Sequence, residues 1–151
     1  MPRYGGAWDE AAVAAFLDET RVPVRIATRT PGDRLWMLSL WFRREGDALL
    51  CATSASADVV EYVDADPEVA FEVSTNDPPY RGVRGNGTAT VTPDPEKTLL
   101  RDLLDRYLGG TDTPLGRRLL DEDREEVRIR IEPDRVHSWD YSDRMAASAE
   151  R

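Results

Sequence analysis

Apolar residues recur along the chain with two different spacings, and each spacing predicts its own kind of element. Val13, Phe16 and Leu17 follow the i, i+3, i+4 spacing of one helix face. Asp9 precedes them, and its side chain can accept a hydrogen bond from a free amide in the first turn of a helix. We therefore expect a capped amphipathic helix over residues 9–20.

The next part of the chain has the pattern of strands. Residues 22–27 alternate between apolar and other side chains, and residues 35–42 form an apolar run. Turn-forming residues at positions 30–33 and 45–47 separate these segments from each other and from a third apolar segment, residues 48–53. The simplest arrangement of the three segments is an antiparallel meander.

The middle of the chain predicts a short helix and two more strands. Residues 54–57 can cap a helix that ends at Asp66, because the residue before a proline is pushed out of the helical region. Residues 68–74 alternate and predict a fourth strand. Residues 82–92 combine β-branched residues with glycines, which mark bends and bulges inside strands. We expect this fifth strand to curl, as strands of a barrel do.

Two helices follow in the sequence pattern. Asp94 is predicted as an N-cap and Pro95 as the first helical residue. The helix ends at Gly109, and one apolar stripe runs along it: Leu100, Leu103, Leu104, Tyr107 and Leu108. Thr113 and Pro114 begin a second, shorter helix.

The remainder of the chain predicts the end of the sheet. The charged run at positions 121–126 is expected to be a solvated linker, and residues 127–131 alternate as a sixth strand. A turn at positions 133–134 is expected before residues 136–139 continue the sheet.

The length of 151 residues fits one domain. We expect residues 1–151 to form a single α+β domain, with six to seven antiparallel strands in a barrel flanked by helices. Residues 1–8 and 146–151 are expected to be flexible ends.

Charge limits the classes of partner. The chain has 29 acidic and 20 basic residues, and its formal net charge of -9 repels phosphate backbones and anionic membrane surfaces. We therefore expect neither nucleic acid nor a membrane as partner. Lys97 is the single lysine among the basic residues, a composition typical of salt-adapted proteins, although a GC-rich genome also favours arginine.

Cysteine content and hydropathy bear on location. Cys51 is the single cysteine and cannot form an internal disulfide. The sequence contains no apolar run of about 20 residues that could span a membrane, and its first residues lack the pattern of a signal peptide. We expect a cytoplasmic protein.

Residue types that form metal sites or catalytic sites in other proteins lack the neighbours that such sites need in this sequence. His137 has no second histidine or cysteine pair at ligand spacing, so no metal site is predicted, and Cys51 is expected to be a small buried hydrophobe. Residues 82–87 lack the spacing and context of a nucleotide-binding glycine loop. No acidic pair stands out as a general acid and base. Any chemistry is therefore expected to come from a bound cofactor.

One arrangement fits a ligand. The apolar segment 35–42 can lie beside a flat ring, and the hydroxyls of Thr53, Ser54 and Ser56 at a helix start can hold a phosphate. The same residues could equally be a barrel core and an ordinary helix cap.

The sequence resembles the pyridoxamine 5'-phosphate oxidase-like family, the flavin-binding split β-barrels. The likeness covers Phe16 to about Met145 and rests on four segments in order and spacing, namely residues 16–22, residues 39–53, residues 66–69 and residues 78–89. The resemblance implies a split barrel that forms a homodimer and binds FMN, or the deazaflavin F420, where the two subunits meet.

The resemblance also implies roles for particular residues. Leu38, Ser39 and Leu40 match the strand whose backbone lies against the isoalloxazine ring. The hydroxyl-bearing turn near the ribityl phosphate matches Thr53, Ser54 and Ser56, and Trp139 and Arg144 match C-terminal residues that approach the ring in some members.

One position departs from the family pattern. Many members place a phosphate-binding lysine or arginine where this sequence has Asp58 and Val59. A phosphate facing Asp58 needs a cation from elsewhere. Either Arg81 or Arg84 supplies it, or the ligand differs, or the site is empty.

The expected function is therefore that of an FMN- or F420-dependent oxidoreductase acting on a small organic substrate. Two alternatives remain open: a protein that binds a flavin or haem-type ligand without turnover, and a dimeric scaffold without cofactor.

Overall fold

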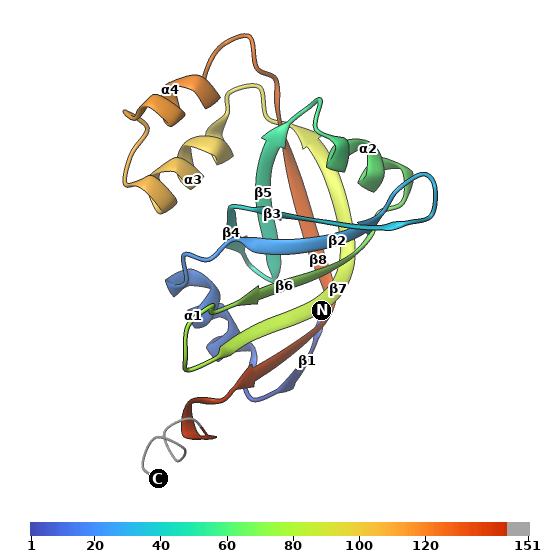
Figure 1. Ribbon diagram of the computed structural model, residues 1–151, viewed down its shortest axis with the longest axis vertical. Helices are drawn as coiled ribbons and strands as arrows, with labels where there is room; N and C mark the ends of the chain where they lie inside the picture. The colour runs from blue at the N-terminus through green and yellow to red at the C-terminus, as the bar shows by residue number, and fades with distance from the viewer. Residues whose placement is uncertain (145–151) are drawn as a thin grey trace.

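One strongly curled sheet with helices at its ends forms the molecule (Figure 1). The computed structural model describes residues 1–144. The strands of this part are β1 (Arg3–Gly6), β2 (Val24–Arg29), β3 (Leu35–Leu40), β4 (Phe42–Glu45), β5 (Ala48–Ser54), β6 (Glu68–Ser74), β7 (Arg81–Pro93) and β8 (Glu126–Asp140). The helices are α1 (Glu10–Glu19), α2 (Asp58–Ala65), α3 (Thr98–Leu108) and α4 (Pro114–Leu119).

The strand order explains the curl. Neighbouring strands pair antiparallel in the order β3-β2-β6-β7-β8-β5-β4, and β1 adds parallel to β8. The two ends of this order, β3 and β4, are separated in sequence by Trp41 alone. The chain therefore passes directly from one edge strand of the sheet to the other, and the sheet curls into a split barrel with β3 and β4 as its edges. The predicted α+β barrel flanked by helices is confirmed.

The predicted three-strand meander is wrong in one respect. The apolar run 35–42 is not one strand, because the chain changes partners at Trp41: β3 pairs with β2, and β4 pairs with β5. Apolar residues occupy both strands, so the run gives no signal of the break. The Tyr107 hydroxyl accepts a hydrogen bond from the Phe42 amide at 3.2 Å, next to the break.

The predicted turn at Pro133 is also wrong. β8 runs unbroken through this position, and its register against β7 shifts between Asn86 and Gly87, so that Asp134 is an extra residue on β8. Proline, which has no amide hydrogen, is accommodated at such a bulge. A Cβ at Gly87 would come within 2.2 Å of the Glu132 carbonyl oxygen, and the register shift lies at this glycine, so the bulge expected among the glycines is confirmed.

Helix starts were predicted less well than helix faces. Asp9 caps α1 as expected and accepts from the Ala12 amide at 2.9 Å. Asp94 is not the N-cap of α3, because the chain first makes a turn in which the Lys97 amide donates to the Asp94 carbonyl. The buried Asp94 carboxylate still accepts from the amides of Thr98 and Leu99 at 3.3 and 3.0 Å. It therefore caps the helix from one turn away.

The structure differs from the predicted flexible ends at the N-terminus. Residues 3–6 form β1 rather than a flexible end, and Trp8 donates its amide to the Ser138 hydroxyl at 2.9 Å. The other predicted flexible end, residues 146–151, lies outside the described residues.

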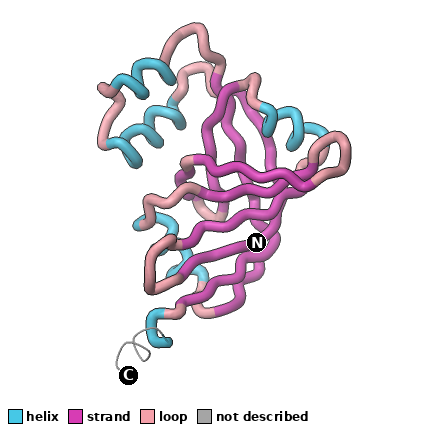
Figure 2. The backbone as a smooth tube through the Cα atoms, viewed as in Figure 1, coloured by secondary structure: helices cyan, strands magenta, loops and turns pink. Residues whose placement is uncertain are grey.

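The core lies inside the curl and is closed by α1 and α2. Its largest fully buried side chains come from several strands and helices, among them Phe42, Ile26, Leu49, Ile129 and Val59. A smaller cluster lies under α3, where Leu99 and Leu103 pack on Leu50. Figure 2 shows α3 and α4 together at one end of the sheet and α1 toward the other. Among residues 1–144, no helix has the length and apolarity that crossing a bilayer requires.

Candidate functional site

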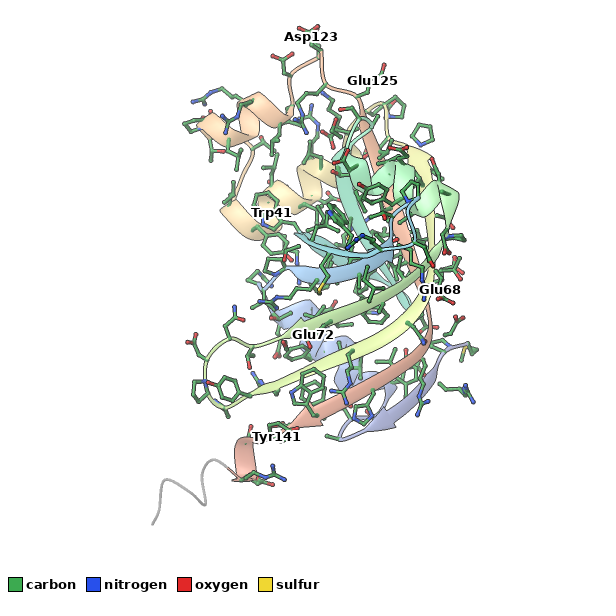
Figure 3. All side chains as sticks on the ribbon, turned by 45° about the vertical axis from the view of Figure 1, so that its right-hand side comes forward. Trp41, Glu68, Glu72, Asp123, Glu125 and Tyr141 are labelled. Carbon is green, nitrogen blue, oxygen red and sulfur yellow. The ribbon has the colours of Figure 1, made fainter. Side chains whose placement is uncertain are left out.

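A cleft between the end of the sheet and the helices α3 and α4 brings several predicted site residues together. Ser39, Leu40 and Thr53 line it, and its volume is about 300 Å³. We call it the helix cleft. Leu100, Leu103 and Leu119 form its helical side. Trp41, between β3 and β4, and Arg124, just before β8, also line it. Figure 3 shows Trp41 beside α3, at the junction of β3 and β4.

An aromatic pair supports the cleft at the break between β3 and β4. The rings of Trp41 and Tyr107 stack with centroids 5.1 Å apart and planes 8° apart. The Tyr107 hydroxyl also lies 3.3 Å from the Phe42 carbonyl oxygen and 3.4 Å from that of Val22. One side chain of α3 thus fixes both the aromatic wall and the end of β3.

The edge position of β3 explains why its backbone could meet a ligand. β3 stands at the end of the sheet order and pairs with β2, so its other edge carries free peptide groups. The Leu38 side chain packs against the core, whereas Ser39 points outward and is exposed. The strand can therefore offer backbone N–H and C=O groups and one hydroxyl.

The turn after β5 holds the predicted phosphate-binding hydroxyls. The hydroxyl oxygens of Ser54 and Ser56 lie 3.0 Å apart, and the Ser56 amide donates to the Ser54 hydroxyl at 3.3 Å. Ala57 is the N-cap of α2 and has no side chain that can accept from the helix, so neither serine caps α2 as predicted. The first amides of α2 thus lack a side-chain acceptor, and the dipole of the helix favours an anion there. Asp58 is exposed to solvent.

The positive charge next to this turn comes from Arg124. Its Nε and Nη2 atoms lie 3.2 and 2.9 Å from one carboxylate oxygen of Glu126, whose side chain is 1% exposed. Arg124 and Glu126 both line the helix cleft with Thr53. The sequence prediction of a solvated linker missed this pair, because a run of mixed charge gives no signal of which member is buried.

Three predicted site residues lie far from the turn after β5, namely Arg81, Arg84 and Trp139. Thr53 pairs with Val127, and Arg84 pairs with His137. These two β8 residues are ten positions apart in the sequence, which corresponds to roughly 30 Å of strand. The structure therefore does not place Arg81 or Arg84 beside Ser54 and Ser56 within one chain.

The arginines at that end of the molecule lie on aromatic rings. The guanidinium carbon of Arg84 is 5.0 Å from the centre of the Trp139 ring, and that of Arg81 is 5.9 Å from Phe16. Arg144 lies in the same way 5.1 Å from Tyr141, near the end of the described residues.

A second concave surface lies on the outside of the sheet, across β3, β2, β6, β7 and β8. Its volume is about 590 Å³, and we call it the outer hollow. Four basic side chains line it, and the sequence analysis had singled out Arg84 among them for a ligand; the others are Arg25, Arg135 and His137. Their convergence depends on the pairing of distant strands and has no signature in the sequence.

The single cysteine is placed as predicted. Cys51 lies in the core, and burial raises the pKa of its thiol to about 12. Among residues 1–144, no three His, Cys, Asp or Glu side chains gather into a group that could hold a metal ion.

Comparison with solved structures supports the same architecture. A conserved hypothetical protein from Mycobacterium tuberculosis is 25% identical with a TM-score of 0.75, covering 93% of this chain and 90% of its own. A protein named F420 reductase is 26% identical with a TM-score of 0.69, covering 80% of this chain and 93% of its own. An FAD-binding protein from Mycobacterium smegmatis, 15% identical with a TM-score of 0.58, shares the fold over 85% of this chain and 92% of its own.

Sequence comparison gives the family. A search of curated proteins found no match. The family model for pyridoxamine 5'-phosphate oxidase matches residues 9–139, which include every strand from β2 to β7 and most of β8. The chain therefore belongs to the pyridoxamine 5'-phosphate oxidase family.

Proposed function

We propose that this protein is an oxidoreductase that binds a flavin-type cofactor, FMN or the deazaflavin F420, and acts on a small organic substrate. The observation that carries the proposal is the helix cleft, in which the end of β3 meets Thr53 of β5, one residue before the hydroxyl-bearing turn begins at Ser54. The likeness to a protein named F420 reductase, at 26% identity, supports the cofactor class.

The residues present fit such a cofactor in two parts. A flat ring fits against the β3 edge, where Leu40 and Trp41 supply apolar surface and the strand supplies peptide groups. A phosphate fits the hydroxyls of Ser54 and Ser56 and the first amides of α2. Because Asp58 is exposed, its carboxylate remains solvated, and it opposes the phosphate less than a buried charge would.

Arg124 is the cation that we assign to this phosphate in place of the residue missing at Asp58. It lines the helix cleft with Thr53, and the amide of Ala55 donates to the carbonyl of Glu125, next to it in sequence. The Glu126 carboxylate offsets part of the positive potential of Arg124, so we expect weaker phosphate binding than an unpaired arginine would give.

The cofactor supplies the hydride chemistry when it is bound, and the chain supplies orientation and exclusion of water. The Trp41–Tyr107 stack and the leucines of α3 and α4 keep the ring side of the cleft apolar. The peptide groups on the free edge of β3 would help to hold and orient such a ring.

We further propose that the protein acts as a homodimer with the cofactor between the subunits. Leu35 and Met37 point outward from β3 and are 80% and 63% exposed, and contact with a second copy would cover them. Such a contact also offers Arg84 and Trp139 of one subunit a route to the cofactor held by the other, which a single chain does not allow.

Binding without turnover is the second candidate. It is favoured by the absence, among the described residues that line the helix cleft, of an unpaired acid or base: Glu126 is held by Arg124. Titration with FMN and with F420, followed by addition of reductants and acceptors to the bound form, separates the two functions. Reduction and reoxidation of the bound cofactor with turnover supports the enzyme, and tight binding without turnover supports the second candidate.

A blocking variant tests the place of binding. Ser39→Trp puts a bulky side chain into the helix cleft from an exposed position, and we expect it to weaken cofactor binding more than ten-fold. Leu108→Trp is the matched control, since Leu108 is 41% exposed at the end of α3 and does not line the cleft. Equal affinity in the two variants would place the cofactor elsewhere.

A further inference from the structure

A cavity between α1 and the inner face of the sheet has no part in the proposed function. Its volume is about 130 Å³, and we call it the α1 cavity. We propose that it binds a small organic amine, with the apolar body of the ligand inside the cavity and the ammonium group at its mouth. The inference goes beyond the proposed function, because it requires neither the cofactor nor a second subunit.

The inner wall of the α1 cavity is apolar. It is formed by core side chains of α1, β5, β6, β7 and β8, each at most 6% exposed: Val13, Leu17, Leu49, Phe71, Val83 and Val136. Protein interiors rarely leave space larger than a water molecule, so a void of this size among core side chains is unusual. Apolar cavities of about 150 Å³ stay dry and bind molecules of the size of benzene. The wall therefore suits an aromatic ring or a short branched alkyl group.

One face of α1 explains why this space exists. The residues of α1 that line the cavity have the i, i+3, i+4, i+7 spacing of a single helix face: Glu10, Val13, Ala14 and Leu17. Ala14 is the small member of this face and is half-buried. A larger side chain at this position would occupy the cavity, whereas the methyl group of alanine leaves it open.

The mouth of the cavity lies where its lining residues become exposed to solvent. Glu10 and Gly46 are exposed there, while Tyr4 and Asp47 are half-buried. The Tyr4 hydroxyl donates to Asp47 Oδ1 at 3.0 Å and so joins β1 to the turn between β4 and β5. Burial, Asp47 and Glu10 together raise the pKa of Tyr4 to about 12, so both carboxylates act on this hydroxyl. The mouth thus has a negative potential.

No ion pair within residues 1–144 involves Glu10 or Asp47. Arg44 also lines the cavity, but its Nε and Nη2 atoms donate to Asp18 at 3.0 and 2.8 Å. Its Nη1 atom donates to the Gly46 carbonyl at 2.9 Å. Because Arg44 is already paired, an ammonium group at the mouth is attracted by Glu10 and Asp47, whereas a carboxylate is repelled.

Calorimetric titration of the full-length protein, without added cofactor, tests the site. The probes are benzylamine, benzyl alcohol and benzoate, which share one ring and differ in charge at pH 7. We expect benzylamine to bind at one molecule per chain, about three-fold more tightly than benzyl alcohol and about ten-fold more tightly than benzoate, because charges at an exposed mouth interact through water. Equal affinity for benzylamine and benzoate, or no binding of benzylamine, would overturn the proposal.

A filling variant tests the place of binding. Ala14→Leu puts an isobutyl group into the cavity, and we expect it to weaken benzylamine binding at least about ten-fold. Ala15→Leu is the matched control, since Ala15 is the next residue of α1, is exposed and does not line the cavity. It makes the same change of side chain and should keep the wild-type affinity. The same affinity in both variants would place benzylamine elsewhere.

A charge variant tests the mouth. We expect Glu10→Gln to weaken benzylamine about three-fold and to leave benzyl alcohol unchanged, as loss of an exposed charge does. Glu19→Gln removes an exposed acid from the other end of α1 and should change neither affinity. A similar loss of benzylamine affinity in the two variants, or none in either, would contradict the place given to the ammonium group.

Methyl NMR of the wild-type protein gives a readout that does not depend on how a variant folds. Benzylamine should shift the methyl signals of Val13, Leu17 and Leu49, which line the cavity. Unshifted signals at saturating benzylamine would overturn the proposal. These outcomes are separate from those of the cofactor titration, which is read from the cofactor's own fluorescence.

Discussion

Glu126 sets the electrostatic character of the helix cleft at the scale of single residues. Its side chain is 1% exposed, and Arg124 holds one of its oxygens with two nitrogens. A buried charge is tolerated when it is paired and becomes costly when its partner is removed. The pair therefore links the stability of the cleft to the cation that we assign to the cofactor phosphate.

Removal of the Arg124 side chain should destabilise the folded protein. We expect Arg124→Ala to lower the free energy of unfolding by about 3 kcal/mol, because the Glu126 carboxylate would stay buried without a partner. Denaturant unfolding followed by circular dichroism measures the change. Arg130→Ala is the control, since Arg130 pairs with the exposed Glu45 and Glu132, and it should cost less than about 1 kcal/mol. Similar losses in both variants would contradict the role given to burial.

The thiol of Cys51 should be inert in the folded protein. Burial raises its pKa to about 12, so at pH 8 the reactive thiolate is scarce and the sulfur is shielded from reagents. We expect an aromatic disulfide reagent to label no thiol in the native protein and one thiol per chain after unfolding. Rapid labelling under native conditions would show that β5 opens readily.

At the scale of elements, the helix α3 organises the site. Tyr107 stacks on Trp41 and bonds to the Phe42 backbone. Arg106 donates to the carbonyl oxygens of Leu17 and Thr20 at 2.7 Å each and so caps the end of α1. One turn of α3 thus fixes both the β3–β4 junction and the helix that closes the barrel.

Tyr107→Phe isolates the hydroxyl of this contact. The ring stack is retained, but the Phe42 amide loses its acceptor at 3.2 Å in a half-buried position. We expect a loss of about 1–2 kcal/mol in unfolding free energy. We also expect weaker cofactor binding, since the end of β3 is no longer fixed. Full cofactor affinity in this variant would separate Tyr107 from the function of the cleft.

The ion pair between α1 and β4 should give a pH-dependent term. The hydrogen bond from Arg44 holds the pKa of Asp18 below its usual value. A lowered carboxyl pKa contributes stability above the unfolded pKa of about 3.9, and this stability is lost as pH falls through the folded value. Because Asp18 is half exposed, we expect Asp18→Asn to cost at most about 1 kcal/mol at pH 7. The difference from wild type should vanish toward pH 2, and a difference that persists there would rule out the ion pair as its cause.

Local patterns predicted most elements, because periodicity reports which face of a segment is buried. They failed where a tertiary contact determines where an element begins, ends or continues. The break at Trp41 follows from closure of the barrel, the straight path through Pro133 from a bulge against Gly87, and the start of α3 from the buried carboxylate of Asp94. The candidate site followed the same rule: Ser39, Leu40 and Thr53 line one cleft, whereas Arg84 and Trp139 lie at the other end of the sheet.

At the scale of the whole molecule, the exposed side chains of β3 suggest that one chain is half of the functional unit. Leu35 and Met37 are the most exposed large apolar residues of the described strands. We expect sedimentation to give twice the mass of one chain. Leu35→Glu together with Met37→Asp should shift the protein toward monomer, because charges would be buried at the contact, while circular dichroism stays unchanged. A monomeric wild-type protein would contradict the dimer.

The central claim is that a flavin-type cofactor binds in the helix cleft. Its most direct test is equilibrium titration of the purified protein with FMN and with F420, followed by the fluorescence of each cofactor. The account predicts saturable binding of one of the two at one molecule per chain, lost in Ser39→Trp and kept in Leu108→Trp. Absence of binding for both cofactors at protein concentrations where the dimer is intact would contradict it.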